Sequence, residues 1–79
     1  MKPTELMKGF LIKSIMEILK RDFDIKSPTP TNLMVTYENG IWSVFYKSNL
    51  MMIDFSNYES IKNLIKEIEN KPIYEKMWL

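Results

Sequence analysis

The sequence predicts an α+β fold: a two-layer sandwich in which a three-stranded antiparallel meander is flanked by helices, in the order α-β-β-β-α with a short C-terminal helix. Two patterns predict it. Apolar residues recur at helical spacing before residue 22 and again after residue 57. Between these segments, apolar and polar residues alternate as in strands on both sides of an Asn-Gly pair. A chain of 79 residues has room for one core, so we expect residues 1–79 to form a single small domain.

The first helix is expected over residues 4–22, with Pro3 in its first turn, where a missing N–H costs nothing. Its apolar stripe predicts one buried face, made of Met7, Leu11, Ile12, Ile15, Ile18 and Leu19. Leu6 and Phe10 fall on the opposite, polar side. They indicate either a second contact near the N-terminus or a different helical phase.

The stretch DIKSPTPTN, residues 24–32, is typical of a connector. Its two prolines exclude a helix and bias the residues before them, Ser27 and Thr29, toward extended backbone. We expect this segment to reverse the chain from the helix into the sheet.

The stretch YENGIW predicts a tight hairpin, because Asn39-Gly40 suits the two left-handed positions of a type I′ turn. This turn sets a register with Glu38 opposite Ile41, Tyr37 opposite Trp42, Val35 opposite Val44 and Leu33 opposite Tyr46. A second turn at Ser48-Asn49 predicts the pairs Lys47 with Leu50, Tyr46 with Met51, Val44 with Ile53 and Trp42 with Phe55. Both registers agree on one apolar face, made of Leu33, Val35, Tyr37, Trp42, Val44, Tyr46, Met51, Ile53 and Phe55.

The segment Ser56-Asn57-Tyr58-Glu59 matches a capping box, which predicts the start of a second helix. That helix carries an apolar stripe of Tyr58, Ile61, Leu64, Ile65 and Ile68. Pro72 ends it or opens a new turn. The tail then places Tyr74, Met77 and Trp78 at i, i+3 and i+4, which predicts a short final helix docked on the body.

The chain lacks the side chains that most enzymes use. It has no His and no Cys, so the common bases and nucleophiles are missing. Carboxylate pairs are the remaining acid–base candidates: Asp22 with Asp24, and Asp54 with Glu59. No calcium-binding loop or glycine-rich phosphate loop is present. We therefore expect a protein that is not an enzyme, with no catalytic residues, no metal and no cofactor.

The order α-β-β-β-α resembles that of double-stranded RNA-binding domains, whose second helix begins with a lysine cluster that contacts phosphates. The corresponding turn here contains Glu59, so the resemblance covers the element order alone. A small basic edge is the alternative site, for a weak nucleic-acid-binding module: Lys13, Lys20, Arg21 and Lys26. Interleaved acidic residues and a net charge of +1 count against nucleic acid as a partner.

The sheet face that the helices leave uncovered is the main candidate for function. The register places an apolar set there: Met34, Phe45 and Met52 side by side, with Leu50 adjacent and Ile41 on the same face. Such a patch is covered by the tail, residues 73–79, by a second copy or by another protein, and the sequence leaves these alternatives open. We expect a non-catalytic binding protein of adaptor or inhibitor type, with a protein partner or itself as a homodimer.

Composition adds an expected location. The absence of cysteine fits a reducing cytoplasm, and the lysines in the first helix count against a signal peptide or a membrane anchor. The abundance of Ile, Lys and Asn is typical of low-GC genomes, phages and other mobile elements.

Overall fold

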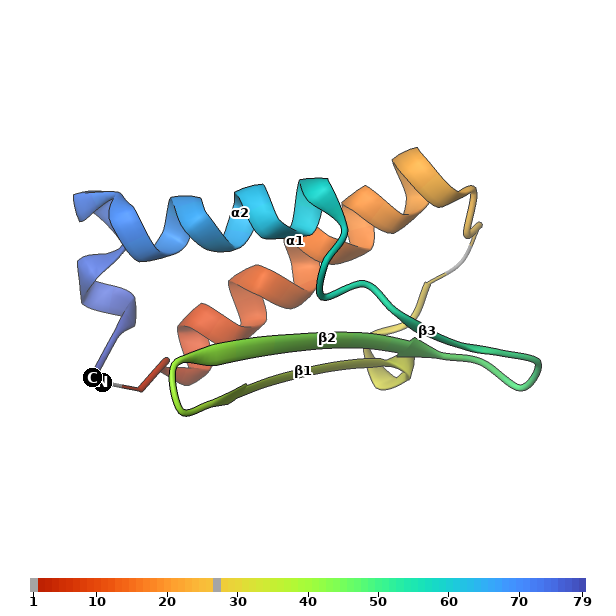
Figure 1. Cartoon of the computed structure of the whole chain (residues 1–79), viewed down its shortest axis with the longest axis horizontal. Helices are drawn as coiled ribbons and strands as arrows, with labels where there is room; N and C mark the ends of the chain where they lie inside the picture. Colours follow the sequence, from red (N-terminus) through yellow and green to blue (C-terminus); the bar gives the residue numbers. More distant parts are fainter. Residues whose placement is uncertain (1, 27) are drawn as a thin grey trace.

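Two helices pack on one face of a three-stranded antiparallel sheet in the computed structural model, which describes residues 2–26 and 28–79 (Figure 1). The elements are α1 (Glu5–Phe23), the 3-10 turn η1 (Pro30–Asn32), β1 (Leu33–Glu38), β2 (Ile41–Lys47), β3 (Met52–Asp54), α2 (Glu59–Asn70) and the 3-10 segment η2 (Pro72–Met77). The predicted α+β class and element order are confirmed. Ser27, expected to be extended, lies outside the described residues.

Helix α1 begins one residue later than predicted, because Thr4 caps it. The Thr4 hydroxyl accepts a hydrogen bond of 3.2 Å from the Met7 N–H. The prediction that Pro3 lies in the first helical turn is wrong: Pro3 precedes the helix and forms an isolated antiparallel bridge with Trp78. The helix ends at Phe23 and is capped by Asp24, which adopts a left-handed φ of 53° and donates its N–H to the Leu19 carbonyl.

The buried face of α1 is the predicted one, since Met7, Leu11, Ile15, Ile18 and Leu19 are buried and Ile12 packs against them. Phe10 makes the second contact that the sequence left open. Its ring lies 5.4 Å from that of Tyr74 in η2. Leu6 remains 66% exposed. The helical phase was therefore correct, and the tail explains Phe10.

Prolines in the connector do not exclude every helical turn. Pro30 opens the single 3-10 turn η1, in the first position, where its missing N–H is not needed. Asn32 donates its N–H to the Thr29 carbonyl at 3.1 Å, and this turn leads directly into β1.

The first hairpin has the predicted register from Leu33↔Tyr46 to Glu38↔Ile41. Asn39 and Gly40 both adopt positive φ, 52° and 78°, as the type I′ turn requires. Local turn chemistry and the apolar pattern agree here, so the pairing is fully determined.

The predicted register of the second hairpin is wrong by two residues. The observed pairs are Lys47↔Met52, Tyr46↔Ile53 and Phe45↔Asp54, so residues 48–51 form a four-residue loop instead of a two-residue turn. Ser48 closes this loop: its N–H donates to the Met51 carbonyl at 2.8 Å, and its hydroxyl accepts from the N–H groups of Leu50 and Met51 at 3.3 Å. Met51, predicted in the core, is 53% exposed.

The predicted capping box is also wrong. The N-cap of α2 is Tyr58, and no side chain caps the helix. The Ser56 hydroxyl instead accepts a hydrogen bond of 2.9 Å from the N–H of Val44, in the central strand. The Val44 carbonyl accepts from the Phe55 N–H at 2.8 Å, so Phe55 faces Val44 and not Trp42.

The tail turns back below the end of α2, at the end of the molecule where the first hairpin turns (Figure 1), and its Tyr74, Met77 and Trp78 pack against the core. Trp78 lies 5.6 Å from Tyr37 and 6.0 Å from Trp42, measured between ring centroids, and its Nε1 donates to the Ile68 carbonyl at 3.4 Å. The two ends of the chain are joined, since Thr4 donates its N–H and its hydroxyl to the Met77 carbonyl at 2.9 and 2.8 Å. The predicted final helix exists as η2, but it completes the core and leaves the outer face of the sheet free.

Candidate protein-binding surface

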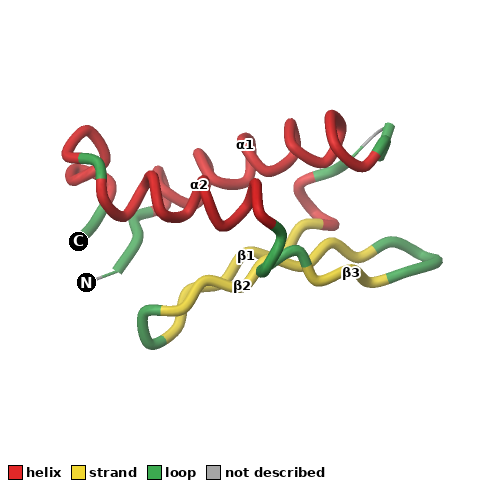
Figure 2. Tube along the Cα trace, turned by 45° about the horizontal axis from the view of Figure 1, so that its top comes forward, coloured by secondary structure: helices red, strands yellow, loops and turns green. Residues whose placement is uncertain are grey.

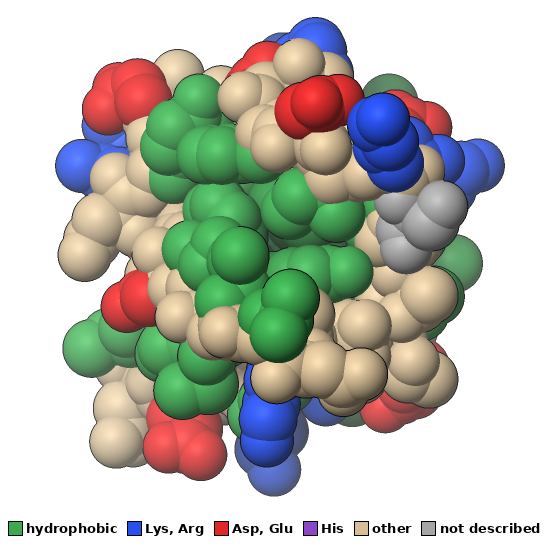
Figure 3. Space-filling model, turned by 90° about the vertical axis from the view of Figure 1, so that its right-hand side faces the viewer, with side chains coloured by type: hydrophobic (Ala, Val, Ile, Leu, Met, Phe, Trp, Pro, Cys, Tyr) green, Lys and Arg blue, Asp and Glu red, His purple; other side chains and the backbone are tan. Residues whose placement is uncertain are grey.

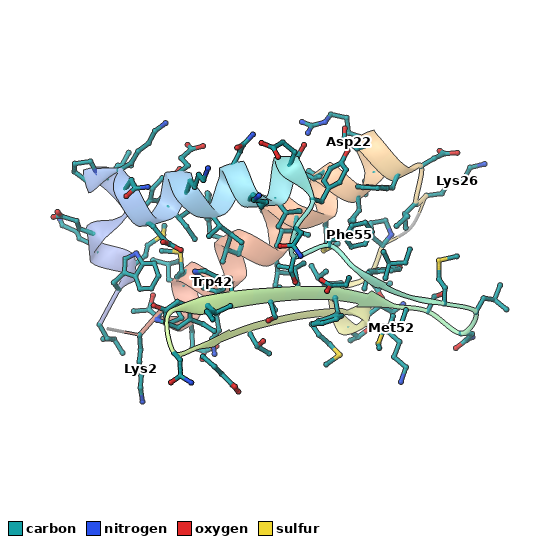
Figure 4. All side chains as sticks on the ribbon, in the orientation of Figure 1. Lys2, Asp22, Lys26, Trp42, Met52 and Phe55 are labelled. Atoms are coloured by element: carbon teal, nitrogen blue, oxygen red, sulfur yellow. The ribbon has the colours of Figure 1, made fainter. Side chains whose placement is uncertain are left out.

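The outer face of the sheet is uncovered within residues 2–26 and 28–79. Both helices and η2 lie on the other side (Figures 1 and 2). Large apolar side chains on the outer face and its adjoining loop are therefore in solvent: Met34 is 50% exposed, Met52 64%, Ile41 67% and Leu50 93%. Figure 4 shows Met52 on the side of the sheet opposite the helices.

The shifted register changes which of these side chains are neighbours. Phe45, half-buried, lies between Met34 in β1 and Asp54 in β3. Met52 pairs with Lys47, so it is the diagonal neighbour of Phe45 and not its direct partner. The predicted row of Met34, Phe45 and Met52 is therefore wrong, although the three side chains share one face.

Ile41 lies apart from this group. It pairs with Glu38 beside the first turn, four residues before Phe45 in the same strand. At about 3.3 Å per residue, that separation is roughly 13 Å. The structure thus brings Met34, Phe45 and Met52 together at one end of the sheet. Leu50 lies in the loop beyond them, and Ile41 lies at the other end of the sheet.

The end of the β2–β3 hairpin is apolar on both sides and projects past the helices (Figure 1). On its outer side lie Phe45 and Met52, and Leu50 forms its tip. On the opposite side Ile53 is half-buried, and Met51 in the loop is exposed. We call residues 45–53 the projecting hairpin. Met51 is a surface residue that the sequence did not predict, because the two-residue turn assigned it to the core; Ile53, also predicted to face the core, packs against it.

Aromatic residues lie between the projecting hairpin and the helix ends. Phe23 at the end of α1 packs 4.7 Å from Phe55 and 4.5 Å from Tyr58, in edge-on arrangements. Phe55 is buried, and the other two rings are half-buried. Figure 3 shows this end of the molecule, where hydrophobic side chains gather across the centre and charged side chains lie around them. An apolar centre with a charged rim is typical of protein–protein interfaces.

Asp54 is a charged group at the edge of this surface. Ser56 lowers the pKa of Asp54 through its hydroxyl and its backbone N–H, and the N–H donates to Oδ1 at 2.8 Å. The carboxylate is thus held ionised beside Phe45.

The basic residues of the alternative site are not assembled into one phosphate-binding surface. Arg21 donates two hydrogen bonds, of 2.8 and 3.2 Å, to the carboxylate of Asp22, which lowers the pKa of that carboxyl. Lys13 and Lys20 border a shallow depression together with Glu17, and Lys26 lies in the connector beyond α1. Partnered and interleaved charges release few counterions, so these residues give weak support to nucleic-acid binding.

One carboxylate of each candidate acid–base pair has hydrogen-bond partners of its own. Asp22 is bonded to Arg21 and to the Ser60 hydroxyl, and Asp54 is bonded to the Ser56 N–H. Within the described ranges, no three acidic side chains are grouped so that they could hold a metal ion.

Two further observations concern relationships and membranes. None of the helices found in residues 2–26 and 28–79 has the length and apolar content needed to cross a bilayer. In comparisons with known proteins, no family model, no curated protein and no solved structure matches this chain.

Proposed function

We propose that this chain is a non-catalytic protein-binding domain, of adaptor or inhibitor type, that contacts another protein through its projecting hairpin. One observation carries the proposal: the hairpin exposes apolar side chains on both sides and at its tip, with Leu50 93%, Met52 64% and Met51 53% exposed. Side chains that are exposed on both sides of a hairpin cannot all be buried by packing it back onto its own core.

The chemistry of these side chains suits a protein partner. Each large apolar side chain gains about 1.5–3 kcal/mol when it is moved from water into a packed contact. Methionine is unbranched and polarisable, so Met51 and Met52 can adapt to the shape of a partner's pocket. Ser48 closes the loop backbone with three internal bonds, which reduces the entropy lost on binding.

Charges at the rim would orient the partner. Lys47 and Asp54 flank the apolar group on the outer face, on neighbouring strands. Rim charges of opposite sign select complementary partners and speed the encounter more than they add affinity. We place this activity in the cytoplasm, since a chain without cysteine suits a reducing compartment.

Site-specific cross-linking tests the proposal. A photo-cross-linking amino acid is placed at position 50 in the tip, and in a second protein at position 41, which is exposed on the same sheet face but outside the hairpin. After irradiation in an extract of the native host, mass spectrometry identifies the adducts. We expect a protein adduct at position 50 and none at position 41.

Charge substitutions supply the matched controls. Met52→Asp, in the hairpin, is expected to abolish the adduct at position 50, whereas Ile73→Asp, at a site 78% exposed on η2, keeps it. Equal loss in both variants, or adducts at both positions, would remove the hairpin from the proposal. An adduct with nucleic acid that disappears at high salt would favour the basic residues instead.

A further inference from the structure

Strand β1 forms a free edge of the sheet. The strand order is β1-β2-β3, so each outer strand has one unpaired side. Strand β1 spans six residues, LMVTYE, whereas β3 spans three. Edge strands are usually protected from pairing by lysine, proline or a bulge, and β1 contains no Lys or Pro and keeps an unbroken register with β2.

Hydrogen bonding in the sheet identifies the backbone groups that point to this edge. The Val44 carbonyl accepts from Phe55, so the main chain of Val44 faces β3. Val35 and Val44 therefore form a non-hydrogen-bonded pair, and the N–H and C=O of Val35 point away from β2. The same alternation directs those of Tyr37 outward, while Leu33 donates its N–H to the Pro30 carbonyl and keeps its C=O free.

We propose that β1 pairs antiparallel with β1 of a second copy, about a two-fold axis at Val35, to form a continuous six-stranded sheet. Val35 then faces Val35 of the second copy, and the two exchange N–H to C=O bonds. On either side, Tyr37 donates its N–H to the free Leu33 carbonyl of the other copy. This register uses the outward donors of Val35 and Tyr37 and requires nothing of the Leu33 N–H, which is already engaged.

Charge complementarity selects this register and this occupant. Lys47 lies one position beyond the Leu33↔Tyr46 pair, on the outer face, and Glu38 lies on the same face at the other end of β1. Pairing about Val35 places Glu38 in the same row as Lys47 of the second copy, two strand spacings or about 10 Å apart between Cα atoms. Both side chains are long enough to meet over that span, and the two-fold axis makes the contact twice.

Neither charge is satisfied within one copy. The ion pairs found among residues 2–26 and 28–79 join Arg21 to Asp22 and Lys71 to Glu67, so Glu38 and Lys47 are free to pair across the axis. Glu38 is the only charged residue of β1. In this register it does not lie opposite Glu38 of the second copy, so the two like charges are kept apart. The surface is thus complementary to itself, as a two-fold interface must be.

The pairing does not depend on the proposed partner binding, because its backbone bonds are made by the β1 edge; of the projecting hairpin it uses Lys47 alone. Sedimentation velocity over a range of protein concentrations tests it. We expect the wild-type chain to change from monomer to dimer as concentration rises. Val35→Pro removes the outward N–H at a position where an edge strand tolerates proline, so it is expected to stay monomeric and folded, while the control Val35→Ala still dimerises.

A charge exchange gives a second readout that does not depend on proline. Glu38→Lys alone should weaken the dimer about fivefold, and Glu38→Lys combined with Lys47→Glu should restore it, as two exposed ion pairs would. A wild-type chain that is monomeric at all concentrations would overturn the inference, as would a dimer that Val35→Pro and Glu38→Lys leave intact. A dimer that only Met52→Asp dissociates would overturn it too, and would place self-association on the hairpin.

Discussion

The main-chain N–H of Val44 donates a hydrogen bond of 2.9 Å to the hydroxyl of Ser56, twelve residues later in the chain. Val44 is 1% exposed, so its N–H has no access to solvent if this bond is lost. With the bond from Phe55 to the Val44 carbonyl, it holds the chain against the central strand beyond the end of β3. This contact places the start of α2 over the core.

Ser56→Ala is expected to lower the free energy of unfolding by about 1–3 kcal/mol, because it leaves a buried N–H donor without a partner. Urea denaturation followed by circular dichroism measures the change. Ser56→Thr keeps the hydroxyl and serves as the control. Glu59→Ala distinguishes the two accounts of Ser56: it should cost only about 0.5 kcal/mol through the helix dipole, and a loss as large as that of Ser56→Ala would restore the capping box.

Trp42 is buried, and its indole Nε1 has no hydrogen-bond partner within the described residues. Trp42→Ala should cost about 3–5 kcal/mol, because it empties a large site beside Tyr37 and Trp78. Trp42→Phe should cost far less, since it keeps an aromatic ring and removes the unpaired donor. Thermal unfolding compares the two. Similar stability losses in Trp42→Ala and Trp42→Phe would contradict this account, because they would mean that the indole N–H makes a stabilising hydrogen bond.

Two apolar residues of the tail, Trp78 and Ile73, should differ sharply in how much stability their replacement by alanine costs. Trp78 packs on Tyr37 and Trp42, so Trp78→Ala should destabilise by about 3 kcal/mol. Ile73→Ala should change stability by less than about 0.5 kcal/mol, because Ile73 is 78% exposed. Chemical denaturation of both variants provides the comparison. A larger loss for Ile73→Ala than for Trp78→Ala would mean that the tail is not docked in this way. The tail would then be free to cover the outer face of the sheet, which is the alternative that the sequence left open.

Asp54 gives a pH dependence of known sign. Its pKa is lowered from 3.8 in the folded chain by Ser56, so its ionised form stabilises the fold at pH values above 3.8. That contribution disappears as the pH falls below 3.8 and through the lowered folded value. The stability advantage of wild type over Asp54→Asn should therefore be constant between about pH 5 and 7 and shrink as the pH falls below 3.8. A difference that grows on acidification would contradict the bond.

The first hairpin and the apolar faces could be predicted because local and long-range signals coincide. Asn39-Gly40 permits one turn type, and that turn puts the buried residues of both strands on one face: Leu33, Trp42, Val44 and Tyr46. The same reasoning holds for the helices, whose stripes match the buried residues of α1 and α2.

The second hairpin could not be fixed in this way. Side chains alternate with a period of two, so registers that differ by two residues bury the same face, and Ile53 and Phe55 point inward in either. The choice depends on the Ser48 side chain, whose bonds to Leu50 and Met51 close a four-residue loop. That detail also decides the candidate site, because it moves Met51 from the core to the surface.

Methionine oxidation tests the projecting hairpin most directly, because methionines lie both on it and in the core. Brief peroxide treatment followed by mass spectrometry reports the accessibility of each methionine. In the isolated chain, Met51 and Met52 should oxidise rapidly and Met7, which is 0% exposed, slowly. In the presence of the partner identified by cross-linking, Met51 and Met52 should become protected while Met7 stays unchanged. Protection of Met51 and Met52 in the isolated monomer, or rapid oxidation of both in the complex, would contradict the account.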